Sequence, residues 1–261
     1  WMNMKYQHII EVDKELCIRC GLCKNDCPVN NIIIENKKSV IKKQDCLMCG
    51  HCAAICPTKA IALTGFDEPP IELTNKPKLD SDELLMAIKS RRSIRKFKDK
   101  EVSSEIVKQI IEAGRYTPSA KNSQDVSYIV LDNKKSIYEN EAVKFFRKIK
   151  PIANIAIKYS KEVEIDDNFF FKHAPIAIMI ITKDKISGSL AASNMALMAE
   201  SYGLGVLFSG YFSDVANNSP KLKKLLGLKR SNHVLTTLVI GYPDVKYRRT
   251  AQKEVATVRY L

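Results

Sequence analysis

The spacing of apolar residues predicts a mixture of helices and strands in the last two thirds of the chain. Leu84, Leu85 and Ile88 form one helical stripe after Asp80, which can cap that helix together with Glu83. The same spacing predicts helices over residues 106–114, 134–149, 189–202 and 218–226, and continuous apolar runs predict strands over 127–132, 174–182 and 234–241. Continuous apolar strands indicate a sheet covered on both faces, and the elements do not alternate strictly, so the expected class is α+β.

Cysteine, and not apolar periodicity, dominates the first part of the chain. All eight cysteines lie between Cys17 and Cys56. They form two runs, CIRCGLCKNDCP and CLMCGHCAAICP, which both read C-x2-C-x2-C-x3-C-P and repeat at an offset of 29 residues. Short strands are expected at 32–35 and 39–41, where they would form a hairpin.

This spacing predicts two 4Fe–4S clusters with crossed ligands, in which each motif gives three cysteines to one cluster and the fourth to the other. The first cluster would be held by Cys17, Cys20, Cys23 and Cys56, and the second by Cys46, Cys49, Cys52 and Cys27. Disulfides would need an oxidising compartment, zinc sites usually have longer spacers between CxxC pairs, and inert buried cysteines would not repeat in register. Residues 5–64 resemble the dicluster bacterial-type ferredoxins.

A proline-rich stretch separates this head from the rest. Pro69, Pro70 and Pro77 interrupt regular structure between residues 65 and 79. We therefore expect a ferredoxin-like domain over 1–64, a stiff linker over 65–79 and a second domain over 80–261.

Four polar motifs punctuate the second domain. They are RRSIRKF (Arg91–Phe97), PSAKNSQ (Pro118–Gln124), GLGVLFSG (Gly203–Gly210) and GYP (Gly241–Pro243), the last followed by KYRR and Lys253. Each alone fits a basic helix end, a polar turn or a helix cap. In this order and spacing they resemble the nitroreductase family of FMN enzymes. The resemblance implies a nitroreductase-like fold, with a central sheet flanked by helices in an intertwined homodimer.

The resemblance also implies which residues bind FMN. These are Arg91, Arg92, Ser93, Arg95, Pro118, Ser119, Ala120, Asn122, Gln124, Asn168, Ser209, Gly210, Arg249 and Lys253. Arg91 and Ser93, with Arg249 or its neighbours, would hold the phosphate and ribityl chain, and Arg95 would lie near the pyrimidine end of the ring. The PSA-x-N segment would reach the flavin of the other subunit. No side chain is assigned as catalytic, because the chemistry belongs to flavin N5, and His173 is interpreted as a packed histidine.

One departure concerns the residues after Gln124. Many relatives have Pro and an aromatic residue there, whereas this chain has Asp125 and Val126. The substrate pocket is therefore expected to differ from theirs.

Charge changes little in this interpretation. The formal net charge is +13, but two clusters and a flavin phosphate would bring the loaded chain to roughly +7. We find no nucleic-acid recognition motif, no apolar run that could span a membrane and no secretory signal at the start, so a cytoplasmic location is expected.

The expected function is that of an iron–sulfur flavoprotein oxidoreductase. Electrons would pass between the 4Fe–4S clusters and FMN to reduce a small organic acceptor of the nitroaromatic, quinone or enone type, with a reduced ferredoxin or flavodoxin as donor. Three alternatives stay open: an NAD(P)H-dependent nitroreductase whose clusters are an electron store or exit, a non-enzymatic electron carrier or redox sensor, and a zinc-bound scaffold.

Overall fold

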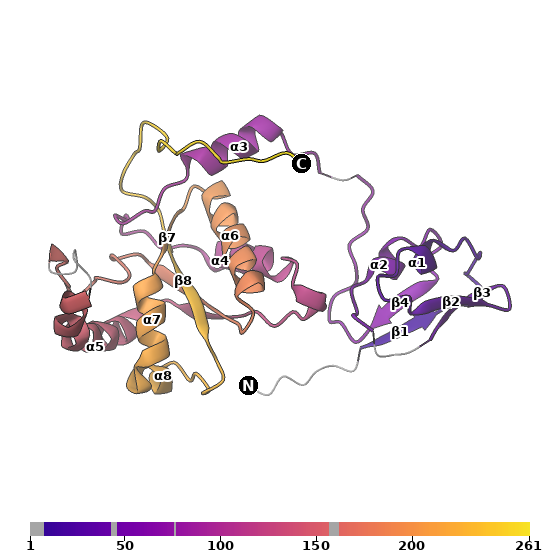
Figure 1. Ribbon diagram of the computed structural model, residues 1–261, viewed down its shortest axis with the longest axis horizontal. Coiled ribbons are helices and arrows are strands. Elements are labelled where there is room, and N and C mark those ends of the chain that lie inside the picture. The colour runs from indigo at the N-terminus through magenta and orange to yellow at the C-terminus, as the bar shows by residue number, and fades with distance from the viewer. Residues whose placement is uncertain (1–7, 43–45, 76, 157–161) are drawn as a thin grey trace. The chain divides into compact units, whose positions relative to one another are not determined.

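The computed structural model describes residues 8–42, 46–75, 77–156 and 162–261, with side chains left out at 152–156. The chain divides into two compact units (Figure 1). The first holds the described residues up to Lys78 together with Ala120–Ser123. The second holds Leu79–Ser119 and the described residues from Gln124 to Leu261.

The first unit repeats itself in structure as well as in sequence. Its elements are β1 (Ile9–Val12), α1 (Leu22–Asn25), β2 (Ile32–Glu35), β3 (Lys38–Ile41), α2 (His51–Ala54) and β4 (Ile61–Thr64). A shift of 29 residues carries β1 onto β3, α1 onto α2 and β2 onto β4. β1 pairs antiparallel with β4, and β2 pairs with β3 in the expected hairpin. The repeat therefore covers every described helix and strand of this unit up to Lys78.

The second unit is built on one antiparallel sheet with the order β5-β6-β8-β7. The strands are β5 (Ser127–Leu131), β6 (Ile176–Ile181), β7 (Gly205–Phe208) and β8 (Val234–Gly241). Every side chain of β6 is buried. Alternate residues of β6 enter two separate cores, with Met179 in one and Ile178 in the other.

Helices cover both faces of this sheet. One core contains residues of α4 (Ser104–Arg115) and α6 (Lys185–Ser201), and the other contains residues of α5 (Lys135–Ala156), α7 (Gly210–Asn218) and α8 (Pro220–Leu225) (Figure 1). The α+β prediction is confirmed. None of the helices in the described ranges has the length and apolar character needed to cross a bilayer.

The first helix of this unit, α3 (Ser81–Ser90), begins as predicted. The carboxylate of Asp80 accepts hydrogen bonds from the backbone N–H groups of Asp82 and Glu83 at 3.0 and 2.9 Å. None of its residues is buried, so its apolar side chains are exposed within the chain.

Several predicted boundaries are wrong. Helix α6 begins at Lys185 and not at 189, because Asp184 caps it by accepting from the N–H groups of Ile186 and Ser187. Helix α5 runs past the predicted end at residue 149, continues through Pro151 and ends at Ala156. The segment interpreted as a cap and turn contains strand β7, and α7 precedes the short α8.

Strand β7 holds the arginine-rich segment against the sheet. The N–H of Ile94 donates to the carbonyl of Val206 at 3.1 Å, and Ser93 forms a parallel bridge with Val206. Gly205 makes this approach possible, because a Cβ there would lie 2.3 Å from Cγ1 of Ile94.

We expect Gly205→Ala to lower the free energy of unfolding by about 1–3 kcal/mol, since the added methyl group overpacks the contact with Ile94. Gly210→Ala is the matched control, because a Cβ there meets nothing within 4 Å. Urea unfolding of both variants measures the difference. Equal stabilities would contradict the close approach.

Candidate functional site

The two cysteine motifs adopt the same local structure. Gly21 and Gly50 both have φ of 77°, a left-handed conformation that glycine adopts without strain, and each begins a single helical turn. The sulfurs of Cys27 and Cys56 accept backbone N–H bonds from Asn31 at 3.2 Å and from Ala60 at 3.3 Å, four residues on in each case. The sequence repeat thus produces two equivalent loops that carry the thiols along short stretches of backbone.

One cysteine set surrounds a cavity. Cys46, Cys49 and Cys52 line it together with Cys27 from the other motif, which is the grouping that crossed ligation requires. Apolar side chains form much of the remaining wall, among them Ile10, Val29, Ile32, Leu47 and Leu63. A cavity that presents four thiols within an apolar wall fits an iron–sulfur cubane.

These thiols stand apart from one another. No three His, Cys, Asp or Glu side chains within the described ranges gather closely enough to hold one metal ion. In a cubane each cysteine binds a different iron, so its ligands stand around a group larger than a single ion.

In the other cysteine set, the sulfurs of Cys17 and Cys23 lie beside the hydroxyl group of Ser39. The Ser39 Oγ lies 3.3 Å from Sγ of Cys23 and 3.7 Å from Sγ of Cys17. Cys56 lies with Thr58, whose hydroxyl oxygen is 3.7 Å from its sulfur, and Cys20 is exposed. Sequence reasoning missed Ser39 and Thr58, although extending the 29-residue offset beyond the cysteines would have drawn attention to both.

The thiols differ in acidity. A backbone hydrogen bond from Ser39 lowers the pKa of Cys17. Burial works to raise the pKa of Cys56, but hydrogen bonds from Thr58 and Ala60 outweigh it and the pKa is lowered. Burial raises the pKa of Cys52 to about 11. Iron binds the thiolate, so Cys52 would release its proton on binding metal.

The arginine-rich segment is fixed between two others in the second unit. Ile94 pairs with β7, and on the opposite side Phe97 bridges Pro243. The N–H of Lys98 donates to the carbonyl of Tyr242 at 2.8 Å, and that of Asp244 donates to Lys96 at 2.9 Å. The RRSIRKF and GYP motifs, far apart in sequence, are therefore neighbours.

Arg91 carries one guanidinium nitrogen, Nη1, that is buried and has no hydrogen-bond partner in the described part of the chain. Its guanidinium lies 5.7 Å from the ring centre of Phe208. Burial raises the pKa of the neighbouring Glu200, and the charge of Arg91 opposes that shift. A buried, unsatisfied guanidinium N–H fits an anionic group such as a phosphate.

The other residues predicted to bind FMN do not all lie in one ordered cluster with Arg91. Arg92 lies over Tyr247 at 5.4 Å, which brings the C-terminal segment near, while Arg95 is exposed and reaches only the carbonyl of Ser93. Ser209 is buried immediately before α7 and does not cap it with its side chain. Arg249 and Lys253 are exposed in a segment without regular structure.

The PSAKNSQ segment forms a strained loop. Lys121, Asn122 and Gln124 have φ of 53°, 53° and 46°, a conformation that is uncommon outside glycine and clusters at functional sites. Ser119 Oγ accepts from the N–H of Gln124. Ala120–Ser123 group with the first unit, where the Asn122 amide donates to the carbonyls of Leu47 and Met48. The proposed contacts of Pro118 and its neighbours across a dimer stay a prediction.

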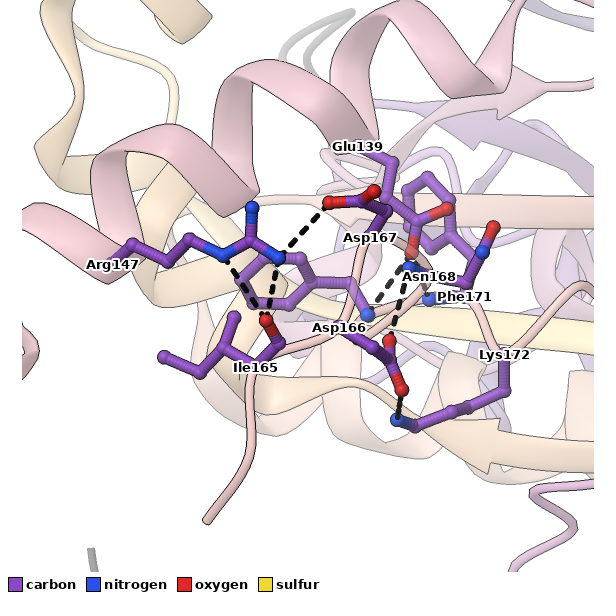
Figure 2. Close-up of polar contacts among 9 residues, drawn as sticks. Glu139, Arg147, Ile165, Asp166, Asp167, Asn168, Phe171 and Lys172 are labelled. Carbon is purple, nitrogen blue, oxygen red and sulfur yellow. Dashed lines mark hydrogen bonds and ion pairs between the residues drawn. The ribbon is translucent and has the colours of Figure 1, made fainter. Parts of the chain in front are cut away.

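Asn168 belongs to a different cluster from Arg91 (Figure 2). It lines a polar cavity with Phe97, Asp99, Lys135, Ser136, Glu139 and His173. Arg147 fixes the approach to this segment by donating to the carbonyl of Ile165 at 2.6 Å and pairing with Asp167 at 2.9 Å. Figure 2 shows Lys172 reaching Asp166 on the same segment.

Glu139 anchors this cluster and was not anticipated from the sequence. Its Oε1 accepts from the N–H groups of Phe170 at 3.0 Å and Phe171 at 2.7 Å. Burial nevertheless raises its pKa to about 7. A glutamate opposite two aromatic residues carries no local sequence signal, because the contact spans about thirty residues.

Two family profiles match the chain. The nitroreductase family profile covers residues 88–242, and a 4Fe-4S dicluster domain profile covers residues 9–57. A protein of Methanothermobacter thermautotrophicus, provisionally named NADH dehydrogenase/NAD(P)H nitroreductase, is 27% identical over 64% of this chain and 80% of its own length. The NADPH-flavin oxidoreductase of Vibrio harveyi is 28% identical over 60% of this chain and 64% of its own.

Solved structures share the fold. The FMN-bound nitroreductase of Bacteroides fragilis has a TM-score of 0.56 at 21% identity, covering 68% of this chain and 99% of that one. The FMN-bound nitroreductase of Desulfitobacterium hafniense has a TM-score of 0.57 at 22% identity, covering 68% and 98%.

Glu139→Gln should flatten the dependence of stability on pH. Because the folded pKa, about 7, exceeds the unfolded value of about 4.3, the folded state binds the extra proton between these limits. The free energy of unfolding therefore falls as pH rises through this window, by at most about 1.4 kcal/mol per pH unit.

Urea unfolding from pH 4.5 to 8 measures that slope. Glutamine keeps an oxygen for the two N–H donors but cannot titrate. The exposed Glu101→Gln serves as control and should keep the original slope. An unchanged slope in Glu139→Gln would contradict the assignment.

Proposed function

The chain belongs to the nitroreductase family, and on this premise we propose that it is an iron–sulfur flavoprotein which passes electrons between 4Fe–4S clusters and FMN to reduce a small organic acceptor. The flavin, when bound, exchanges electrons with the acceptor, and the clusters carry them singly. Nitroaromatics, quinones and enones are the acceptor classes we propose. A reduced ferredoxin or flavodoxin is the proposed donor.

The observation that carries this proposal is that one chain contains two sites, each suited to a different kind of cofactor. The first unit offers a cavity lined by Cys27, Cys46, Cys49 and Cys52, whose soft thiol donors suit iron–sulfur clusters. The second offers the buried Nη1 of Arg91, which lacks a hydrogen-bond partner in the described part of the chain and suits a phosphate. A simple carrier of electrons would need only the first of these.

The chain's own residues would bind and orient the flavin. Arg91 and Ser93 would hold the phosphate and ribityl chain, helped by Arg249 or Lys253 from the C-terminal segment. Arg95 would place its cation near the pyrimidine end of the ring, where it stabilises negative charge. Gly210 would present its backbone N–H group at the start of α7, whereas the N–H of Ser209 already donates to the carbonyl of Thr237 at 2.8 Å. We assign no side chain as a proton donor.

We also propose that the active form is a homodimer. Helix α3 exposes Leu84, Leu85, Met86 and Ile88, each by 41–56%, and the C-terminal segment exposes Val255 and Tyr260. Apolar groups this exposed are typical of a surface that is covered in the assembled protein. Covering them would complete the site with the partner's PSAKN segment.

A second candidate donor has support from the relatives. NADPH appears in the name of the flavin oxidoreductase of Vibrio harveyi, so NAD(P)H would supply electrons directly and the clusters would serve as an electron store or exit. Rapid reduction of bound FMN by NAD(P)H alone, with substrate turnover, would favour this candidate over the ferredoxin-driven one.

We expect Arg91→Gln to weaken FMN binding about tenfold to a hundredfold, since it removes a charged hydrogen-bond donor to the phosphate. Quenching of flavin fluorescence measures the dissociation constant. Arg115→Gln is the matched control, because Arg115 lies on α4 and pairs with Glu112. Equal affinities for the two variants would place the phosphate elsewhere.

Anaerobic reconstitution tests the whole proposal. We expect eight irons and one FMN per chain, a mass corresponding to two chains, and turnover in a matrix of donors and acceptors. The donors are reduced ferredoxin, reduced flavodoxin, NADH and NADPH. Turnover no faster than free FMN with every acceptor would reject the enzyme and favour the electron carrier. A colourless, zinc-loaded protein would reject both.

A further inference from the structure

The internal repeat of the first unit places different side chains at equivalent positions around the two cysteine sets. Shifting by 29 residues superposes Ile10 on Ser39 and Val29 on Thr58. In each pair the apolar residue belongs to the cavity of the second set, and the hydroxyl residue contacts the first set. The repeat therefore provides its own internal comparison.

The first set receives polar side chains directly. Ser39 is 3% exposed and its Oγ lies 3.3 Å from Sγ of Cys23. The hydroxyl oxygen of Thr58 lies 3.7 Å from Sγ of Cys56. A metal-bound thiolate can only accept hydrogen bonds, so both hydroxyl groups would donate to sulfur. Lys38 adds a cation, since its Nζ donates to the carbonyl of Cys17 at 3.0 Å.

The second set meets hydrocarbon instead. Ile10 and Val29 both line the cavity that contains Cys27, Cys46, Cys49 and Cys52, and neither side chain can donate a hydrogen bond. Ile9 stands where the first set has Lys38, and Met48 stands where it has Arg19. The positions of Ser39, Thr58 and Lys38 are thus occupied by apolar residues in the second set. The position of Arg19 is occupied by a methionine.

Backbone contacts do not create the difference at the last cysteine of each motif. The N–H of Asn31 donates to Cys27, and the N–H of Ala60 donates to Cys56, at 3.2 and 3.3 Å. These two bonds are equivalent under the repeat and act on cysteines of opposite sets, so the asymmetry at Cys27 and Cys56 resides in the side chains. At Cys17 the backbone N–H of Ser39 adds a further donor to sulfur at 3.5 Å.

At two other equivalent pairs of positions the polarity difference favours the second set, but the polar residue of each pair is at the surface. Asp26 in the first motif replaces Ile55, and His51 in the second replaces Leu22. The side chains of Asp26 and His51 are exposed, so solvent and salt screen them, whereas Ser39 is buried.

We propose that the two clusters have unequal reduction potentials, with the cluster at Cys17, Cys20, Cys23 and Cys56 the more positive because Ser39 and Thr58 donate hydrogen bonds to its thiolates. Reduction adds one electron and one negative charge to a cluster. Donors at sulfur stabilise that charge, and an apolar wall opposes it. This inference rests on the proposed function, which supplies the two clusters.

A direction of electron transfer follows. In a chain that holds a single electron, the cluster held by Cys17, Cys20, Cys23 and Cys56 would be the reduced one, and the cluster held by Cys46, Cys49, Cys52 and Cys27 would be the oxidised one. No proton or further reagent is needed for an electron to pass between them. The first cluster would therefore be reduced first, and reduction of the second would need a stronger reductant.

An anaerobic redox titration of the full reconstituted chain, followed by electron paramagnetic resonance at pH 8, tests the proposal. We expect two separate one-electron steps in the wild type. Ser39→Ala with Thr58→Val should make reduction in the more positive step about tenfold less favourable, a shift of about 59 mV, and leave the other step in place.

The reciprocal change provides the matched control. Val29→Thr adds the hydroxyl to the second set at an exposed position, and it should move the more negative step upward while leaving the other unchanged. Ser39→Ala alone keeps the test usable if the double variant fails to fold.

The outcomes separate the inference from the proposed function. A chain that binds fewer than eight irons contradicts the proposed function itself. A chain with eight irons whose two clusters titrate together, or whose more positive step ignores the loss of both hydroxyl groups, overturns the inference and leaves the proposed function intact.

Discussion

The pairing of residues 93–98 with strand β7 on one side and with residues 242–244 on the other is the interaction on which the second unit's site depends. The Ile94–Val206 and Lys98–Tyr242 backbone hydrogen bonds fix an extended, strongly basic segment at the edge of the sheet. Gly205 supplies the space for this contact. Because its backbone is paired on both sides, the segment keeps the half-buried Arg91 in place, and the Nη1 atom of this side chain stays buried.

The first unit solves a different problem, which is to place thiols around a large inorganic group without a substantial core. It does so by using one short design twice, with a left-handed glycine, a single helical turn and a backbone donor to the last sulfur. The hydroxyl groups of Ser39 and Thr58 then distinguish two halves that would otherwise offer their clusters the same surroundings.

Sequence periodicity predicted the α+β class, the buried strands and the start of α3, because these depend on local patterns of apolar and capping residues. The cysteine spacing groups Cys27 with Cys46, Cys49 and Cys52, and these four cysteines line one cavity, while their role as cluster ligands stays a prediction. The start of α6 was misplaced because Ser187 and Gly188 resemble a loop, and only the cap at Asp184 reveals the helix. Glu139 could not be foreseen, since its partners Phe170 and Phe171 are brought to it by tertiary folding alone.

The position of Cys27 has a consequence for how the first unit is damaged. This cysteine belongs to the first motif by sequence but lines the cavity formed by the three cysteines of the second. Neither half of the repeat can therefore complete a cluster by itself, and a chain cut between the halves would lose both centres together. Oxidation of Cys27 alone would act differently, because it would disable the cavity of the second motif and leave the first motif its own three cysteines. Chemical damage to the last thiol of one motif would therefore be felt in the other half of the repeat.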